Sequence, residues 1–248
     1  MSIDDEKKGD LFGLAAYGEA LNTLAKGTVD GAGAFLSRIC LPAAEEFGLL
    51  LRDKVSAWRA RNAIQIVLAA DRILEDRVQN DELHAHPRLV MKIVSEGSWV
   101  EDGDVQRMWA GLLASSCTEE GRDETNLIFV NILSQLTGCE ARIINYGCEA
   151  SEKMITEAGW LSAEELQIEL DPLVKLTGVL DFHRLDRELD HLRSLELIGG
   201  GLGGGGFHQR SRTADITPSS LALQMYARCC GHVGSPVEFY NLDESNEA

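Results

Sequence analysis

Apolar side chains recur at spacings of three and four residues over residues 42–78, the pattern of an amphipathic helix. The same spacing returns after Pro87, over residues 102–116 and over residues 126–135. None of these segments alternates with a strand pattern, so we predict a helical bundle domain over residues 42–160 and no parallel α/β sheet. The apolar members of the pattern include Phe47, Leu50, Leu51, Val55, Trp58, Ile64, Val67, Leu68, Leu89, Val90, Ile93, Val94, Val105, Met108, Trp109, Leu112 and Leu113.

The N-terminal residues 1–41 form a separate segment rich in glycine and alanine. Glycine in a helix costs about 1 kcal/mol relative to alanine. We therefore expect one or two marginal helices over residues 11–37, with a break near Gly27–Gly33. The small residues favour close helix packing, against the chain itself, a partner or a membrane surface.

Local signals predict where several later helices begin. Thr137-Gly-Cys-Glu140 and Ser162-Ala-Glu-Glu165 match the capping box, in which Ser or Thr starts a helix and Glu three residues later caps it in return. Asp181 is a further candidate N-cap, and Thr217 followed by Pro218 predicts the start of the last helix.

The C-terminal region predicts the order helix, short strand, hairpin, short strand, helix. A glycine run, Gly199–Gly206, forms the expected hairpin tip, and short alternation follows it. This order is typical of a winged-helix unit, so we predict a small winged-helix-like α+β module over residues 161–232 and an acidic tail over residues 233–248. The expected fold class is mainly α, a helical bundle domain followed by this module.

The predicted hairpin is locally basic, because it carries His208, Arg210 and Arg212. We take these three residues as candidate contacts for a partner. The preceding helix, residues 181–194, alternates acids and arginines, a pattern typical of a salt-bridged surface and unsuited to reading a DNA groove. The module is therefore expected to contact protein.

The 248-residue chain carries a formal net charge of −17. Because binding to nucleic acid requires basic residues that displace counterions from phosphate, nucleic acid is not an expected partner. No apolar stretch reaches the about 20 residues of a membrane-spanning helix, and the acidic start differs from a secretory signal. We expect a cytoplasmic protein whose six cysteines are reduced core residues.

The sequence shows no catalytic, cofactor-binding or metal-binding set. The glycine run precedes extended sequence, whereas a phosphate-binding loop leads into a helix N-terminus. His84-x-His86 and Cys229-Cys230 have no second pair at zinc-site spacing. The carboxylates are spread as on solvated helix faces. We expect no catalytic residue, cofactor or metal, and hence a non-enzymatic protein.

Four central segments carry a recognisable pattern: Ser98-Trp-Val-Glu-Asp102, Gln106-Arg-Met-Trp-Ala-Gly-Leu-Leu-Ala-Ser-Ser-Cys117, Asn126-Leu-Ile-Phe-Val-Asn131 and Gln135-Leu-Thr137. Together they resemble the abortive infection alpha family of bacteria, with the resemblance running from about residue 42 to residue 226. It implies a helical protein tied to phage defence, in which an infected cell stops growing or dies, and it implies no catalytic residues.

The most specific part of the resemblance is Trp109–Leu113. Trp109, Leu112 and Leu113 also have a plain structural interpretation as core residues of one amphipathic helix. The long glycine run departs from a usual winged-helix ending, so the resemblance assigns no function to the wing.

The leading hypothesis is a non-enzymatic bacterial anti-phage protein that acts through contacts with a phage or host protein, or with further copies of itself in a homo-oligomer. One alternative is a membrane-active effector that uses residues 11–51 for peripheral membrane contact. The other alternative is a DNA-binding winged-helix regulator that uses the basic hairpin.

Overall fold

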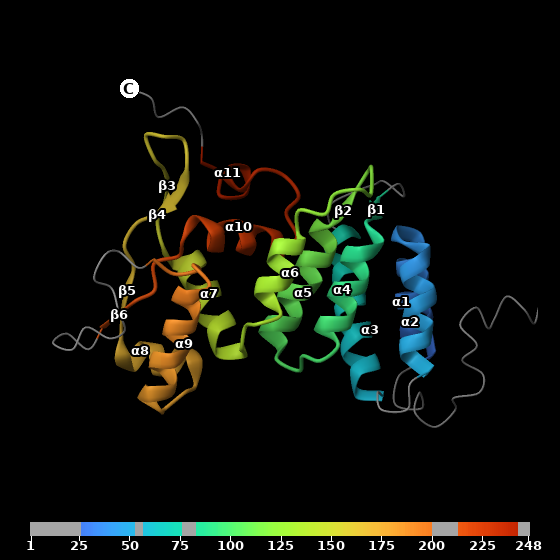
Figure 1. The fold of residues 1–248 in the computed structure, drawn as a ribbon, viewed down its shortest axis with the longest axis horizontal. Helices are drawn as coiled ribbons and strands as arrows, with labels where there is room; N and C mark the ends of the chain where they lie inside the picture. Colours follow the sequence, from blue (N-terminus) through green and yellow to red (C-terminus); the bar gives the residue numbers. More distant parts are fainter. Residues whose placement is uncertain (1–25, 53–56, 76–82, 200–212, 243–248) are drawn as a thin grey trace, which may run out of the picture. The chain divides into compact units, whose positions relative to one another are not determined.

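A computed structural model describes residues 26–52, 57–75, 83–199 and 213–242 (Figure 1). These residues form eleven helices and six short strands. The strands of the described residues occur only as antiparallel pairs. The mainly helical fold class expected from the hydrophobic pattern is confirmed.

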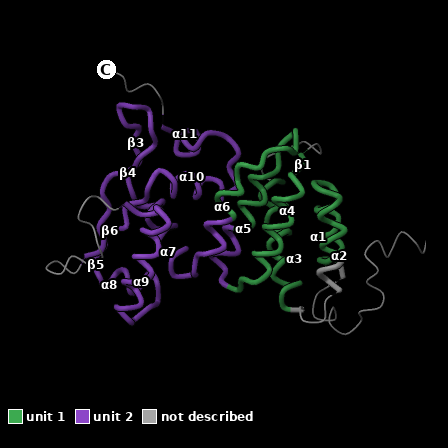
Figure 2. The backbone as a smooth tube through the Cα atoms, viewed as in Figure 1, with its two compact units in different colours: residues 1–101, 109–130 green, residues 102–108, 131–248 purple. Residues whose placement is uncertain are grey.

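The chain forms two compact units, shown in different colours in Figure 2. Unit 1 comprises residues 1–101 and 109–130, and unit 2 comprises residues 102–108 and 131–248. Two helices, α5 (Gly103–Ser115) and α6 (Leu127–Leu133), contribute residues to both units. The domain boundaries predicted after residues 41, 160 and 232 stay predictions.

Unit 1 is built from helices and one short strand pair. Helix α1 contacts α2 and α3, and α4 packs against α2 and α3. Strand β1 pairs with β2. Besides parts of α5 and α6, the elements are α1 (Lys26–Ile39), α2 (Leu41–Arg52), α3 (Ala57–Glu75), β1 (His84–Ala85), α4 (Pro87–Gly97) and β2 (Cys117–Thr118).

Helix α1 runs without interruption through Gly27, Gly31 and Gly33, so the predicted break was wrong. The helix buries Val29, Ala32, Phe35, Leu36 and Ile39 in the core of unit 1. A Cβ atom added at Gly31 would lie 3.5 Å from the Leu68 side chain of α3, an ordinary van der Waals distance, so this position faces α3 without requiring glycine. Tertiary packing therefore outweighs the low helix propensity of glycine.

Trp109 lies in the core of unit 1, with 0% of its surface exposed. Gly97 ends α4 against it, since a Cβ there would lie 3.2 Å from Cγ of Trp109 and 2.7 Å from the Ile66 side chain. Leu112 and Leu113 are also fully buried on the same helix. The segment that carries the family resemblance thus supplies core residues.

Unit 2 is built around α7, which contacts α8, α9 and α10. Strand β3 pairs with β4, and β5 pairs with β6. Its elements are α7 (Gly138–Ala150), β3 (Lys153–Ile155), β4 (Leu161–Ala163), β5 (Gln167–Glu169), α8 (Leu170–Thr177), α9 (Phe182–Ser194), β6 (Thr213–Asp215), α10 (Ser220–Cys229) and α11 (Pro236–Phe239).

The helix starts of unit 2 match the local signals only in part. The capping box at Thr137 and the N-cap at Asp181 are confirmed. The capping box expected at Ser162 was wrong, because Ser162 lies in β4 opposite Met154. The last long helix begins at Ser220 with Ser219 as its N-cap, because the Thr217 hydroxyl accepts from the Leu166 N–H and donates to Asp215.

The C-terminal part of the chain has the expected α+β character. Helix α9 is followed by an isolated bridge between Ile198 and Pro218, then by β6 and α10. Residues 200–212, which include all of the predicted hairpin tip Gly199–Gly206 except Gly199, lie outside the described residues. The winged-helix assignment stays a prediction.

Candidate functional site

The residues predicted to contact a partner, His208, Arg210 and Arg212, lie outside the described residues. Two other groups of side chains are candidates for a functional site or for a network that stabilises one. One is a polar network at the start of α5 and α7 in unit 2. The other is an exposed aromatic patch in unit 1.

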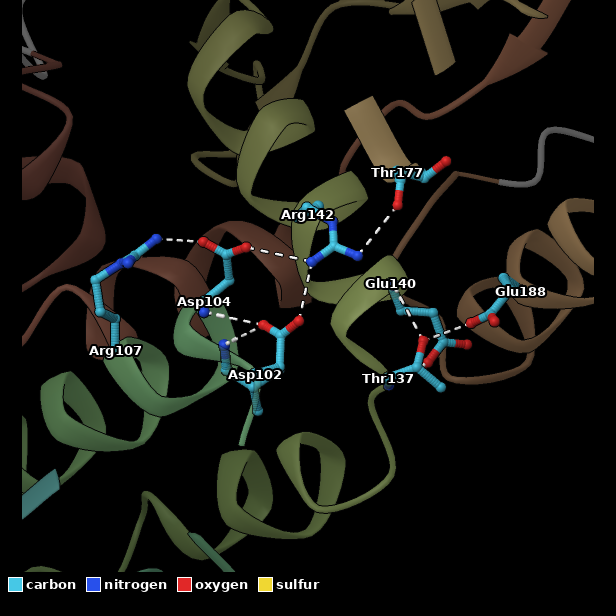
Figure 3. A network of polar contacts seen from close by, with 9 residues as sticks. Asp102, Asp104, Arg107, Thr137, Glu140, Arg142, Thr177 and Glu188 are labelled. Atoms are coloured by element: carbon cyan, nitrogen blue, oxygen red, sulfur yellow. Dashed lines mark hydrogen bonds and ion pairs between the residues drawn. The ribbon is translucent and has the colours of Figure 1, made fainter. Parts of the chain in front are cut away.

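The polar network centres on the ion pair between Asp102 and Arg142 (Figure 3). Oδ1 of Asp102 accepts hydrogen bonds from the backbone N–H groups of Asp104, at 2.9 Å, and Val105, at 3.3 Å, and so caps α5. Oδ2 accepts from Nη1 of Arg142 at 2.9 Å. Nη2 of Arg142 donates to the Thr177 carbonyl at 3.1 Å, so one guanidinium joins α7 to the start of α5 and the end of α8.

The pKa values of both side chains are shifted in the direction that favours their charged forms. Burial alone would raise the pKa of Asp102, but hydrogen bonds from Val105 and Arg142 outweigh it and hold the pKa below its usual value. Burial likewise opposes the charge of Arg142, and the contact with Asp102 outweighs it and raises the pKa of the guanidinium. Gly138 leaves room for the pair, because a Cβ there would overlap the Asp102 carboxylate.

Replacing Asp102 with asparagine should lower the free energy of unfolding by about 1–2 kcal/mol at neutral pH, because the amide can still cap α5 but cannot pair with the Arg142 charge. A lowered folded-state pKa contributes stability that is complete above the ordinary value of 3.8 and is lost as the pH falls through the lowered value. Urea unfolding at several pH values should therefore show a full difference at neutral pH that shrinks in acid.

The matched control for this prediction is Glu157→Gln, which neutralises an exposed carboxylate in a turn of the same unit. Its unfolding curve should follow that of the parent. A destabilisation by Asp102→Asn that stays constant down to strongly acidic pH would show that the ion pair does not contribute.

The second part of the network lies where α7 meets α9. Glu140 is 1% exposed, and its carboxylate accepts from the Thr137 N–H at 2.8 Å and lies 2.6 Å from Nδ1 of His191. The Thr137 hydroxyl donates to Glu188, whose other oxygen accepts from Nε of Arg184 at 3.1 Å. These bonds satisfy two buried carboxylates and connect the two helices.

The chemistry available in this network is limited by the absence of an activated nucleophile among the described residues around it. A carboxylate beside an imidazole can orient a histidine base. However, the Thr137 hydroxyl is engaged by Glu188. Burial, assisted by the nearby Glu188 charge, raises the pKa of the Cys139 thiol to about 11, whereas reactive thiols have lowered values. The arrangement is that of a structural clamp.

The aromatic patch in unit 1 is formed around Trp99, whose side chain is 55% exposed just after the end of α4. The guanidinium of Arg59 lies over the Trp99 ring, 3.9 Å from its centroid. The ring of Trp58 lies 6.2 Å from that of Trp99, and its indole N–H donates to Glu101. We call Trp58, Arg59, Trp99 and Glu101 the Trp99 patch.

The patch is held by Ser98, which is itself fully buried. Nδ2 of Asn62, a buried residue, donates to the Ser98 carbonyl at 3.1 Å. Nε of Arg59 donates to the Ser98 hydroxyl at 3.0 Å, and that hydroxyl donates to the Ser95 carbonyl at 2.6 Å. Trp99 is therefore fixed on the surface before any partner binds, which lowers the entropic cost of binding.

The helical pattern placed Trp58 among inward-facing residues, but the structure places it in the partly exposed Trp99 patch. Trp99 itself was part of the family pattern and was not singled out as a site. Its position after Gly97 and Ser98, where helical periodicity ends, was the one available signal that it could face solvent.

The N-terminal segment proposed for membrane contact is partly described. In residues 26–52 the apolar side chains Phe35, Leu36 and Phe47 are buried within unit 1. Residues 11–25 lie outside the described residues. Among the helices that the structure describes, none is both long and apolar enough to cross a membrane.

Comparison with protein families gives a match over residues 61–203, more than half of the chain, to the family described as abortive infection alpha. The matched range includes Trp99, Trp109 and the whole polar network, and it begins just after Arg59. No curated protein and no solved structure shows a significant match. The resemblance seen in the central segments is confirmed, and the chain belongs to the abortive infection alpha family.

Proposed function

We propose that the protein acts in abortive infection as a non-enzymatic binding protein that recognises a phage or host protein in the cytoplasm through the Trp99 patch. Membership of the abortive infection alpha family ties the chain to this response. The observation that carries the proposed contact is the 55% exposure of Trp99 beneath a stacked arginine.

The composition of the patch favours a protein as the partner. Tryptophan and arginine are the residues most enriched at the energetic centres of protein interfaces. The patch combines them with the carboxylate of Glu101, so a partner meets an apolar centre flanked by both signs of charge. The net charge of −17 opposes a nucleic-acid partner.

The buried thiols support a non-enzymatic protein. Burial raises the pKa of Cys148 and of Cys229, as it does that of Cys139. Thiols with raised pKa values carry little thiolate at neutral pH and are poor nucleophiles. In the polar network, the Glu140 carboxylate and the Thr137 hydroxyl are engaged in hydrogen bonds that join elements of the fold.

The membrane alternative requires rearrangement of the described part of residues 11–51. The buried side chains of Phe35, Leu36 and Phe47 would have to leave the core of unit 1 before they could enter a lipid surface. The core surface that these side chains cover would then be exposed to water, which costs about 25 cal/mol per Å² of apolar area. The burial of these side chains therefore favours the protein-contact proposal.

The DNA alternative leads to a separate prediction. We expect no measurable binding of the full chain to random duplex DNA even at low ionic strength, because the negative net charge is then least screened. A gel shift across a series of salt concentrations measures this. Micromolar binding that falls steeply with salt, and that is lost when Arg210 and Arg212 are both replaced by glutamate, would favour the DNA-binding regulator instead.

Affinity capture from infected and uninfected cells tests the proposed function. The baits are the parent chain, Trp99→Ala, and Ile128→Ala as a matched control, since Ile128 is an exposed apolar residue of unit 1 at 60% exposure. We expect a defined protein to be retained by the parent and by Ile128→Ala and to be lost from Trp99→Ala. Retention of the same proteins by all three baits would refute the assignment of the contact to the patch.

A further inference from the structure

The hairpin formed by β3 and β4 in unit 2 has one buried face and one exposed face. In its register Met154 lies opposite Ser162, and Ile155 lies opposite Leu161. Because side chains alternate between the faces of a strand, Ile155 and the buried Leu161 share the inner face. Met154, at 43% exposure, and Trp160, at 71%, share the outer face.

Two carboxylates continue the same outer face. The Glu164 N–H donates to the Glu152 carbonyl at 2.8 Å, so these two residues lie opposite each other, one step beyond Met154 and Ser162 along the outer face. Both are exposed. Like charges directly opposite each other in a strand pair are destabilising. The outer face therefore holds an apolar pair beside an acidic pair.

The acidic character extends around the hairpin. From residue 149 to residue 171 the chain contains seven acidic residues and a single basic one, Lys153. The Lys153 ammonium donates to the backbone carbonyls of Glu149, at 3.1 Å, and Ser151, at 2.6 Å. Because side chains alternate along a strand, Lys153 lies on the inner face, where it is not placed to neutralise Glu152 and Glu164.

The hairpin is fixed in this conformation by its own backbone and by α10. The Thr156 N–H donates to the Trp160 carbonyl at 2.9 Å, and the Gly159 N–H donates to the Thr156 carbonyl at 2.8 Å. Gly159 has φ of +80°, which a side chain would strain. The Ser220 hydroxyl of α10 donates to the Leu161 carbonyl. Trp160 is thus presented on an ordered turn.

We propose that Glu152, Met154, Trp160 and Glu164, here called the Trp160 face, are a docking surface for a basic segment of a partner protein. An arginine or lysine of that segment would lie between the two carboxylates and remove their mutual repulsion, while an apolar side chain beside it would cover Trp160 and Met154. This surface lies in unit 2 and does not depend on the Trp99 patch.

The negative charges of the hairpin favour a basic protein segment as the partner over an anionic membrane or a nucleic acid. An anionic membrane and a nucleic acid would both be repelled by the acidic residues around Trp160. A basic segment would instead be attracted, and its arginine can make two parallel hydrogen bonds to a carboxylate.

The test is a fluorine NMR titration of the full chain labelled with 5-fluorotryptophan. The chain has four tryptophans, and each signal is assigned with a Trp→Phe variant. The probe is an eight-residue peptide that alternates arginine and leucine, and its control alternates glutamate and leucine. We expect the arginine peptide to shift the Trp160 signal in a saturable, salt-sensitive manner, to leave Trp99 unchanged, and the glutamate peptide to shift neither.

Variants distinguish binding of the peptide at the Trp160 face from nonspecific electrostatic attraction to a negatively charged protein. Trp160→Ala should raise the Kd of the arginine peptide at least about tenfold. Glu152→Gln with Glu164→Gln should raise it about fivefold, because two charges that flank the contact are removed. Glu119→Gln with Glu120→Gln, which makes the same change in net charge at two exposed residues of unit 1, should leave it within about twofold.

The proposal is overturned if the Trp160 signal does not move, or if both double variants weaken binding equally. It is also overturned if vesicles of neutral phosphatidylcholine shift the Trp160 signal as the peptide does, which would indicate a membrane contact. A shift of the same signal on simple dilution of the protein would identify a second copy of the chain as the occupant and would likewise overturn it.

Discussion

Replacing Trp109 with alanine is expected to lower the free energy of unfolding of unit 1 by about 3–5 kcal/mol, the usual cost of truncating a large buried aromatic side chain. Trp109 is fully buried, and Gly97 of α4 lies directly against its ring, where a Cβ would be only 3.2 Å from Cγ of Trp109. These contacts leave little freedom for the surrounding side chains to fill the cavity. Urea unfolding followed by the helical circular dichroism signal measures the effect.

Trp109→Phe is the matched control for this prediction. The smaller ring still fills much of the cavity, and the substitution removes an indole N–H that has no hydrogen-bond partner among the described residues. Its cost should stay below about 2 kcal/mol. If Trp109→Ala unfolds at the same urea concentration as the parent, the side chain is not the core residue that the structure shows.

Replacing Trp99 with alanine is expected to remove protection against phage while leaving the unfolding curve close to that of the parent. Because Trp99 is half exposed, its truncation should change stability by less than about 1 kcal/mol. Truncating the central aromatic residue of an interface costs at least about 2 kcal/mol, or about 30-fold in affinity. Plaque counts on lawns that contain equal amounts of each variant measure the loss.

Ile128→Ala and Arg59→Lys complete this comparison. Ile128→Ala removes a similarly exposed apolar side chain and should protect like the parent. Arg59→Lys keeps the charge but loses the planar group that stacks on Trp99, so it should protect at an intermediate level. Full protection by Trp99→Ala would show that the patch is not the contact.

The helices of this protein could largely be predicted from sequence because their signals are local. The three- and four-residue spacing of apolar residues correctly predicted α3, α4 and α5, and the capping box at Thr137 predicted the start of α7. The same kind of signal failed at Ser162, where pairing with Met154 in β3 determined the structure. In α1, burial of Val29, Ala32 and Phe35 in the core outweighed the low helix propensity of the glycines.

The candidate sites were harder to predict because they depend on residues far apart in the sequence. Arg142 meets Asp102 across 40 positions and the Thr177 carbonyl across 35. Arg59 reaches the Ser98 hydroxyl across 39 positions. Periodicity places Trp109 on the apolar side of α5, but nothing near Trp99 in the sequence indicates that a distant arginine holds it at the surface.

Photo-crosslinking in infected cells tests the proposed contact most directly. A photoreactive benzoylphenylalanine is placed at Glu96, an exposed residue whose carbonyl accepts the Trp99 N–H at 3.1 Å, and in a control chain at Ile128. The proposal predicts a discrete adduct with one other protein from position 96 and none from position 128, in cells that still resist phage. Resistance without an adduct from position 96, or with the same adducts from both positions, would contradict it.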